Sequence, residues 1–473
     1  MEKQLKIHPN LKPIAAATLL ALATISPTAQ AASNAELEAQ VKALTQLVEQ
    51  LRQDVAKKTD SSNVATQEDV EGVRADLENF KYDQSRSRER NTVKSARDTT
   101  FFGVVQIRAQ GQSESTTSGN PAPTDSRKST FEVPTALFGL RGNLYRDYVD
   151  GKNLDYQMSF TYAKRTTQAG GTSDLNLADA FVRYHLTSTN GGLEVPRVNL
   201  TLGQQLLPFG LEAQAPEDLR PTINVSQASA RLGLFTRQVG AILRGDVEPY
   251  VDYAANYRAP LAEFALGVVN GNTSNKVDDN GHKDILGRAA FTLPVPYASW
   301  LRELKIGASV YKGKKNIASG TALLTGSGKK DRYGFDIYYN HAPFGATYEY
   351  IQGRDDRALG GIAQEVKSEG HTLTLFYTVG DQFFNSIKSV AKFDDSWPQS
   401  VQFFYRHDQF NPNTNRSADT DHGDSVRINT LGLNWFFAQT TKLQLGINRW
   451  DYRKSTATQK DFTELQAQVQ YTF

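Results

Sequence analysis

Apolar and polar residues alternate strictly at the end of the chain. In the segment 464–473, ELQAQVQYTF, every second residue from Leu465 to Phe473 is apolar or aromatic, and the residues between them are Glu, Gln and Thr. A period of two indicates a β-strand, because successive side chains of a strand point to opposite faces. Such a strand belongs either to a soluble antiparallel sheet whose apolar face packs on a core, or to a membrane barrel whose apolar face meets lipid.

The same alternation recurs along most of the chain and predicts about sixteen strands, an even number as in transmembrane barrels. Their expected bounds are 101–112, 131–142, 154–164, 175–186, 197–207, 236–245, 260–270, 284–293, 303–312, 331–340, 343–353, 368–379, 399–410, 425–437, 441–453 and 462–473. Short connections, such as 341–343 and 438–440, alternate with long ones. The long ones are 113–130, 208–235, 313–330, 354–367 and 411–424. This alternation is typical of an all-β transmembrane barrel of antiparallel strands, and a barrel of this size encloses water. An extra strand at 249–258 and the irregular segment 380–398 leave eighteen strands as an alternative.

The N-terminal part of the chain has a different pattern. Residues 1–31 combine a basic start, a short apolar stretch and the sequence Ala29-Gln30-Ala31, which together predict a secretory signal peptide. Residues 32–82 are expected to be helical, with heptad positions at Leu37, Val41, Leu44, Val48, Leu51 and Val55. These positions predict a short coiled coil, and a single amphipathic helix that folds back is the alternative. Residues 83–99 read as a charged linker, and residues 100–473 as the barrel.

Composition agrees with a barrel and excludes a bundle of transmembrane helices. The mean hydropathy is −0.50, and after the signal peptide no apolar run approaches the ~20 residues that a membrane-spanning helix needs. The chain has 473 residues and no cysteine, so disulfides and thiol chemistry are excluded. The net charge is +2, and residues 1–31 contribute three lysines and one glutamate, which leaves the mature chain nearly neutral. Any preference for anions must therefore come from where the charges lie.

Three short motifs carry a resemblance to a known family. The segment GQQLLPFGLE at 203–212 resembles the GQ-x-x-x-PFG-LE segment of phosphate-selective porins of the O and P type. RQVGAILRGD at 237–246 is similar to the R-x-x-G-x-x-L-x-GD stretch of that family, and ALGVVNG at 265–271 is similar to one of its strand ends. The resemblance covers most of residues 100–473 in layout and implies a trimer of sixteen-stranded barrels in the bacterial outer membrane, each barrel with its own anion channel.

The resemblance also implies passive diffusion of phosphate or polyphosphate, with the N-terminal segment in the periplasm. Two other functions remain open: a carbohydrate porin, in which Phe181, Phe376 and Phe404 would form part of an aromatic track, and a structural barrel anchored through its coiled coil. The seven histidines form no recognisable nucleophile arrangement, and no metal-ligand spacing or phosphate-binding glycine loop is present in the sequence. We therefore expect no enzymatic activity, no cofactor, no metal and no nucleic-acid partner.

The long connection 208–235 contains the first candidate residues for anion selectivity. The resemblance implies that it folds into the lumen, and it carries Arg220 and Arg231, with Arg237 just beyond it. Arginine suits phosphate because its planar fork donates two parallel hydrogen bonds to an oxyanion. The alternative is that these arginines pair with the nearby acids Glu212 and Glu217 and hold the loop in place.

The phase of the strands places further basic residues toward the lumen, because a charge on the lipid face at mid-depth costs about 2–4 kcal/mol. These pore-lining candidates are Arg108, Arg183, Arg288, Lys305 and Arg406. The same phase leaves open a structural role, in which they pair with acids of the barrel wall.

Two further features concern partners of the barrel. Lys314, Lys315, Lys329 and Lys330 lie in the expected connection 313–330, where a basic outer loop would attract anions to the mouth or contact lipopolysaccharide phosphates. The terminal Phe473, preceded by alternate apolar residues, resembles the signal by which the barrel assembly machinery recognises its substrates.

Overall fold

The computed structural model describes residues 42–53 in part, 67–90, 99–113, 129–147, 149–164, 173–253, 257–341, 343–359, 361–380, 400–414, 425–437, 441–453 and 460–473. The chain divides into two units, Met1–Glu89 and Arg90–Phe473. In the first, α3 (Gln67–Arg90) continues through residues 83–90, where the sequence suggested a linker. Among the described residues, no helix has both the length and the apolarity needed to cross a membrane. The signal peptide and every predicted heptad position except Val48 lie outside the described residues, so the coiled coil stays a prediction.

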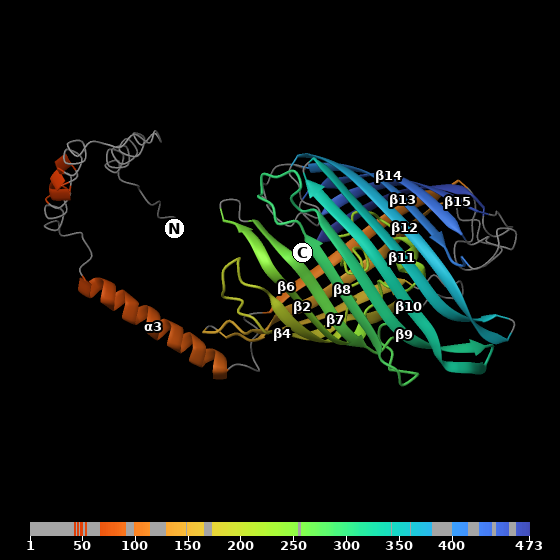
Figure 1. The fold of residues 1–473 in the computed structure, drawn as a ribbon, viewed down its shortest axis with the longest axis horizontal. Helices are drawn as coiled ribbons and strands as arrows, with labels where there is room; N and C mark the ends of the chain where they lie inside the picture. The colour runs from red at the N-terminus through yellow and green to blue at the C-terminus, as the bar shows by residue number, and fades with distance from the viewer. Residues whose placement is uncertain are drawn as a thin grey trace, which may run out of the picture. The chain divides into compact units, whose positions relative to one another are not determined.

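The second unit is a closed antiparallel barrel, and the described residues supply sixteen strands (Figure 1). The strands are β1 (Thr100–Gln112), β2 (Ser129–Tyr145), β3 (Leu154–Lys164), β4 (Ser173–His185), β5 (Val198–Gln205), β6 (Gln238–Asp252), β7 (Tyr257–Val269), β8 (Asp284–Thr292), β9 (Lys305–Ser319), β10 (Ala322–His341), β11 (Phe344–Leu359), β12 (Ile362–Gly380), β13 (Ser400–Asn411), β14 (Val426–Phe436), β15 (Lys442–Tyr452) and β16 (Phe462–Thr472). Each strand pairs with its sequence neighbours, and β1 pairs with β16 to close the barrel. Residues 249–252 end β6 and residues 257–258 begin β7, so the alternative of an extra strand there is wrong.

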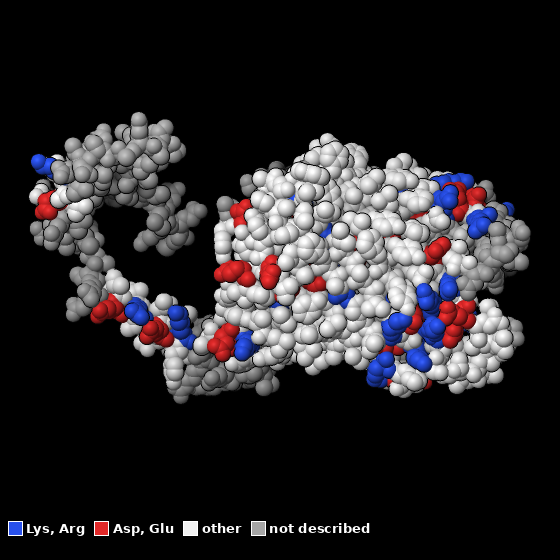
Figure 2. Space-filling view, viewed as in Figure 1, with Lys and Arg blue, Asp and Glu red and all other residues white. Residues whose placement is uncertain are grey.

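The barrel is polar inside and apolar outside, which is the reverse of a soluble protein. On β16, Gln466, Gln468 and Gln470 are at most 5% exposed, whereas Leu465 and Val469 are 57% and 50% exposed. The same alternation runs along β13 and β15. Figure 2 shows a largely uncharged band across the middle of the visible barrel face, with charged side chains gathered toward its ends. An apolar outer band around a polar interior is what a lipid bilayer requires of a barrel.

Two expected loops are strands in the structure. The sequence placed connections at 313–330 and 354–367, but β9 continues to Ser319 and β10 starts at Ala322, while β11 continues to Leu359 and β12 starts at Ile362. Here the strands remain hydrogen-bonded beyond the point where apolar and polar residues stop alternating. They extend past the band that faces lipid, and their outer parts carry polar residues on both faces. Gly320 and Gly361, at φ +62° and +81°, supply the left-handed backbone of the short turns.

We call the end at which β1 begins and β16 ends the terminal end, and the opposite end the far end. At the terminal end, Phe473 closes the seam between the two strands. Its N–H donates to the carbonyl of Gly103 at 3.1 Å, and its carbonyl accepts from the Gly103 N–H at 2.9 Å. Its ring lies over Gly103, where a Cβ would come within 2.3 Å of it, and 5.5 Å from the Phe101 ring. The last residue thus completes the β1–β16 ladder.

Deleting Phe473 is expected to reduce the amount of folded barrel inserted in the membrane, because two seam hydrogen bonds and the ring cover are lost together. The measurement is the fraction of heat-modifiable protein in purified outer membranes. Phe437→Ala is the control, since this aromatic lies at the same end, is half-exposed and stacks on Trp435 away from the seam. Equal insertion of the truncated and full-length chains would remove the role assigned to Phe473.

Candidate functional site

The connection between β5 and β6 folds into the barrel, as the resemblance implied. We call residues 206–237 the constriction loop. Its Leu207, Phe209, Leu232 and Leu234 are at most 6% exposed, because they pack inside the barrel against apolar residues of the wall. Those wall residues are Ile242, Val269, Leu286, Tyr311, Ile351, Phe410, Val426 and Ile428. The main apolar core of the barrel is therefore the contact between this loop and the wall, and the loop narrows the lumen.

The motif Pro208-Phe209-Gly210 fixes the entry of the loop. The Gly210 N–H donates to Ser309 Oγ at 3.0 Å, and the Leu211 N–H donates to Glu349 Oε1 at 3.0 Å. The Phe209 ring covers Gly334, where a Cβ would come within 2.8 Å of it. These contacts attach the loop to β9, β10 and β11. The PFG sequence is therefore explained by its role in anchoring the start of the loop to the barrel wall.

Gly210→Ala is expected to destabilise the barrel more than Gly233→Ala. Both glycines belong to the constriction loop and have positive φ, +56° and +67°, a backbone state that costs other residues roughly 1–2 kcal/mol. At Gly210 a Cβ would also lie 1.7 Å from Glu349 Oε1, whereas at Gly233 it meets open space. Urea unfolding of both variants measures the difference, and equal losses would show that the contact with Glu349 adds nothing.

In its middle the loop lies against the opposite wall, held by its backbone carbonyls. The donors are inward side chains of β1, β14, β15 and β16. The contacts are Gln106 to Glu217 O (3.3 Å), Gln470 to Asp218 O (2.9 Å), Lys442 to Arg220 O (2.6 Å), and Asn434 and Gln444 to Pro221 O (2.9 and 3.3 Å). The inward amides that made the sequence alternate therefore satisfy the backbone of a loop that crosses the lumen.

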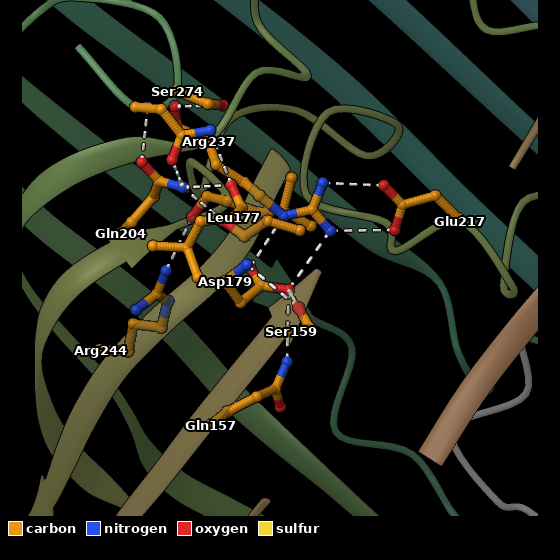
Figure 3. A network of polar contacts seen from close by, with 12 residues as sticks. Gln157, Ser159, Leu177, Asp179, Gln204, Glu217, Arg237, Arg244 and Ser274 are labelled. Atoms are coloured by element: carbon orange, nitrogen blue, oxygen red, sulfur yellow. Dashed lines mark hydrogen bonds and ion pairs between the residues drawn. The ribbon is translucent and has the colours of Figure 1, made fainter. Parts of the chain in front are cut away.

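Arg237 fastens the end of the loop to the wall (Figure 3). Its guanidinium donates to Asp179 of β4 at 2.9 and 3.3 Å, and to both carboxylate oxygens of Glu217 at 2.8 and 3.0 Å. Asp179 also accepts from Ser159 at 3.0 Å and from Gln157 at 3.3 Å. Burial alone would raise the pKa of Glu217, but its hydrogen bonds to Arg237 and the charge of that residue outweigh burial and lower the pKa to about 2. Glu217 is therefore ionised across the physiological range.

Arg406 and Arg288 are also buried and paired. Arg406 lies 3.0 Å from Glu212 of the loop and 4.0 Å from Asp408, and it donates to the carbonyl of Asn224 at 2.9 Å. The N–H of Gln227, which begins the short helix α4 (Gln227–Arg231), donates to Asp408 at 2.8 Å. Arg288 of β8 makes a two-pronged contact with Asp336 of β10 at 2.5 and 2.8 Å. Arg237, Arg288 and Arg406 are thus paired with acids. This is the structural role that the sequence left open as an alternative to lining the pore.

The remaining candidates each contact different partners. Arg108 donates to Gln468 at 3.0 Å and is 3.4 Å from Glu132. Lys305 pairs with Glu263. Arg183 lies over the Phe181 ring at 5.1 Å, and Arg231 lies over the Phe410 ring at 5.5 Å and bonds Gln227. The backbone carbonyl of Arg220 accepts a hydrogen bond from Lys442, and the Arg220 guanidinium charge lies near Glu217.

The four lysines expected in an outer loop lie on strands, which corrects that prediction. Lys315 and Lys330 bond inward acids, Asp355 at 3.1 Å and Asp284 at 3.2 Å. Lys329 pairs with Glu365, and the Lys314 backbone donates to Asp284 at 2.9 Å. The charges are interleaved with acids because the extended ladders place both on neighbouring strands.

A cavity of about 640 Å³ lies between the constriction loop and the wall formed by β5 to β12. Its charged lining residues are Arg197, Glu212, Arg244, Asp246, Glu263, Arg288, Lys305 and Glu349. The two signs are equal in number, so selectivity depends on which charges are already paired. Asp246 is paired with Arg258 at 2.8 Å, and Glu349 accepts the Leu211 N–H in the loop anchor.

Arg244 of β6 differs from Arg288, which lines the same cavity and is paired with Asp336. It donates to Gln205 Oε1 at 2.6 Å and to the Leu206 carbonyl at 3.1 Å, both neutral acceptors. Within the described part of the chain it forms no ion pair, and it remains partly exposed to the cavity. Arg197, which precedes β5, is exposed on the same cavity.

Sequence reasoning did not select Arg244, although it lies inside the RQVGAILRGD motif. Its inward phase, shared with Gln238 and Asp246, was the available signal. Two of the three inward phenylalanines that would favour an aromatic track are covered, whereas Phe181 is partly exposed and lies under Arg183. Phe376 and Phe404 are 8% and 4% exposed, face each other across β12 and β13, and Phe404 packs over Gly432.

Comparisons with known proteins agree with this architecture. The profile of the family described as phosphate-selective porin O and P matches residues 105–323 and 308–473. Among curated proteins, none matches the chain significantly in sequence. The structure of Salmonella typhi OmpF in complex with daunomycin is 11% identical over 79% of this chain and 97% of its own, with a TM-score of 0.50.

Two other outer-membrane structures are similar at lower scores. The in-vitro folded trimer form of OmpT, an outer-membrane protein of Vibrio cholerae, is 10% identical over 79% of this chain and 99% of its own, with a TM-score of 0.47. The outer-membrane channel DcaP of Acinetobacter baumannii is 12% identical over 79% and 97%, with the same TM-score of 0.47.

Proposed function

The chain belongs to the phosphate-selective porin O and P family, and we propose that its barrel is an anion-selective pore through which phosphate or polyphosphate diffuses passively. That it is an outer-membrane channel follows from the family and the porin-like barrel. The preference for anions rests on one observation: Arg244 reaches the lumenal cavity, and the contacts that hold it there within the described chain are with neutral acceptors.

An arginine without an acidic partner can compensate an anion for the water it loses in a narrow pore. The guanidinium fork matches two oxygens of a phosphate, and pores lined by Arg or Lys select anions. Some N–H groups of Arg244 already donate to Gln205 and to the Leu206 carbonyl. An anion is therefore held by the remaining N–H donors and by the positive charge. Shallow binding of this kind lets the ion leave, as conduction requires.

The paired arginines support this pore in another way. Arg237, Arg288 and Arg406 are each neutralised by carboxylates, so they contribute rigidity and little field. A fixed constriction loop keeps the cavity open beside Arg244 at a constant width. We further propose that the terminal end and the N-terminal helical segment face the periplasm and that the chain is a homotrimer, as the family resemblance implies.

The test is a planar bilayer with the purified full-length protein under a potassium chloride gradient, with the current measured before and after phosphate is added. We expect a reversal potential of the sign set by chloride and a decrease of the chloride current by low phosphate. Cation selectivity would contradict the proposal. Anion selectivity without any effect of phosphate would keep the pore and exclude phosphate as its solute.

A further inference from the structure

The outward face of β9–β12 carries a group of cations at the far end of the barrel. Lys312, Lys314, Lys329, Arg354 and Lys367 make up what we call the far-end basic patch. Four acids share this face: Asp331, Asp356, Glu365 and Glu369. In Figure 2 blue and red side chains gather at the end of the barrel toward which these strands extend.

Within the described chain, some members of the patch are held in direct ion pairs, whereas Arg354 and Lys367 are not. Lys312 bonds Asp331 at 2.9 Å, and Lys329 bonds Glu365. Arg354 and Lys367 lie directly opposite each other in the β11–β12 ladder. Arg354 donates to the neutral Gln352 and lies 5.2 Å from the Tyr333 ring centre. Two acids lie beside this pair, and each already bonds another lysine. Asp331 is opposite Arg354 in the β10–β11 ladder and bonds Lys312, and Glu365 is close to both cations and bonds Lys329.

Like charges directly opposite on neighbouring strands are destabilising. Turn or packing requirements do not explain this pair, because both side chains are on the outer surface of a regular ladder. An anion placed between the two cations would convert the repulsion into attraction. The pair therefore has the charge arrangement of a phosphate site.

The depth of the pair points to the source of that phosphate. Toward the middle of the barrel follows a zone of aromatic and polar side chains that bond one another: Tyr348 with His371 at 2.9 Å, and Tyr405 and His407 with Asn429 at 2.9 Å each. Below them Phe403 and Leu431 are 50% and 64% exposed on the apolar band. Aromatic girdles mark the edge of the lipid-facing band, so Arg354 and Lys367 lie at the level of lipid head groups.

We propose that Arg354 and Lys367, with the surrounding lysines of the far-end basic patch, bind the phosphate groups of lipid A, the phosphorylated glycolipid anchor of lipopolysaccharide. The arginine fork holds two phosphate oxygens and the lysine supplies a point charge beside it. The acyl chains then lie along the apolar band of β11–β13. This site is on the outside of the barrel and is separate from the cavity at Arg244. It rests on the proposed orientation, in which the far end faces the outer leaflet.

The test uses the purified full-length protein in detergent and measures binding of diphosphoryl lipid A and of the same lipid after removal of its phosphates. The variant Arg354→Gln/Lys367→Gln is expected to bind diphosphoryl lipid A at least about tenfold more weakly, because charge-assisted hydrogen bonds are lost. Dephosphorylated lipid A is expected to bind the wild type and this variant equally and weakly.

The matched control is Arg427→Gln/Arg449→Gln, which removes two exposed cations from the outward face of β14 and β15. It should bind lipid A as the wild type does, and bilayer conductance should be unchanged in both variants.

Equal losses of lipid A binding in both double variants would show that the effect depends only on net charge and would overturn the proposal. So would tight binding of dephosphorylated lipid A, or displacement of the lipid by excess inorganic phosphate, which would show a site for free phosphate. Lipid binding is read independently of ion selectivity, so this proposal and the proposed function can fail separately.

Discussion

Replacing Arg237 with methionine is expected to lower the free energy of unfolding by about 3–5 kcal/mol, because removal of one partner leaves buried charges without compensation. Asp179 and Glu217 would both lose their cation, and Arg237 itself is only 8% exposed, so water cannot easily replace it. The end of the constriction loop would also be released from β4. We expect single-channel recordings of the variant to show larger and noisier conductance than the wild type.

The triple variant Arg237→Met/Asp179→Asn/Glu217→Gln separates the charge from the packing. Replacing a whole buried ion cluster is often nearly neutral in stability, so the triple variant should recover most of the loss. The folded-state pKa of Glu217 is lowered from 4.5 to about 2. Its contribution is therefore complete above about pH 4.5 and disappears as the pH falls toward 2.

In Arg237→Met, burial without the cation should raise the pKa of Glu217 above 4.5. The variant then takes up a proton as the pH falls, so its loss of stability relative to wild type should be larger at neutral pH than at about pH 5. Urea unfolding at these two pH values, followed by tryptophan fluorescence, is the measurement. A methionine variant as stable as the wild type would show that the loop is held by its apolar contacts and carbonyls alone.

The barrel could be predicted from the sequence because the bilayer imposes one rule on every spanning strand. Leu465 and Val469 had to face lipid and Gln468 had to face water, so the period of two identified the strands one by one. This alternation of apolar and polar residues is required only along the part of each strand that faces lipid. From Gly313 to Lys330 the alternation of apolar residues stops while the β9–β10 ladder continues, and a loop was predicted in place of a hairpin.

The site was predicted less completely, for a different reason. Strand phase decides that Arg406 points inward, but its partner Glu212 is 194 residues away in the sequence, and only the fold of the constriction loop brings the two together. Arg237 and Asp179 are 58 residues apart and meet in the same way. Whether an inward arginine is neutralised or open to a solute depends on such distant contacts. For this reason the sequence named Arg237 and passed over Arg244.

Arg244→Gln is the second variant with a large expected effect, on selectivity instead of stability. At 4 Å a unit charge acts on an ion with about 1 kcal/mol even in bulk water, so we expect the ratio of anion to cation permeability to fall about fivefold. Block by phosphate should weaken by at least the same factor, because the fork is lost as well. Unfolding should change little, since the hydrogen bonds of Arg244 go to the neutral Gln205 and the Leu206 carbonyl.

Two matched variants distinguish charge from geometry at this position. Arg244→Lys keeps the charge and loses the fork, so it should retain the reversal potential of the wild type and bind phosphate more weakly. Arg449→Gln removes one arginine from the outer surface, where it is paired with Asp451 at 2.9 Å, and should change neither property. If Arg244→Gln leaves selectivity unchanged while the wild-type channel is anion-selective, the field must come from the other cations that line the same cavity. Arg197, Arg288 and Lys305 then become the residues to change.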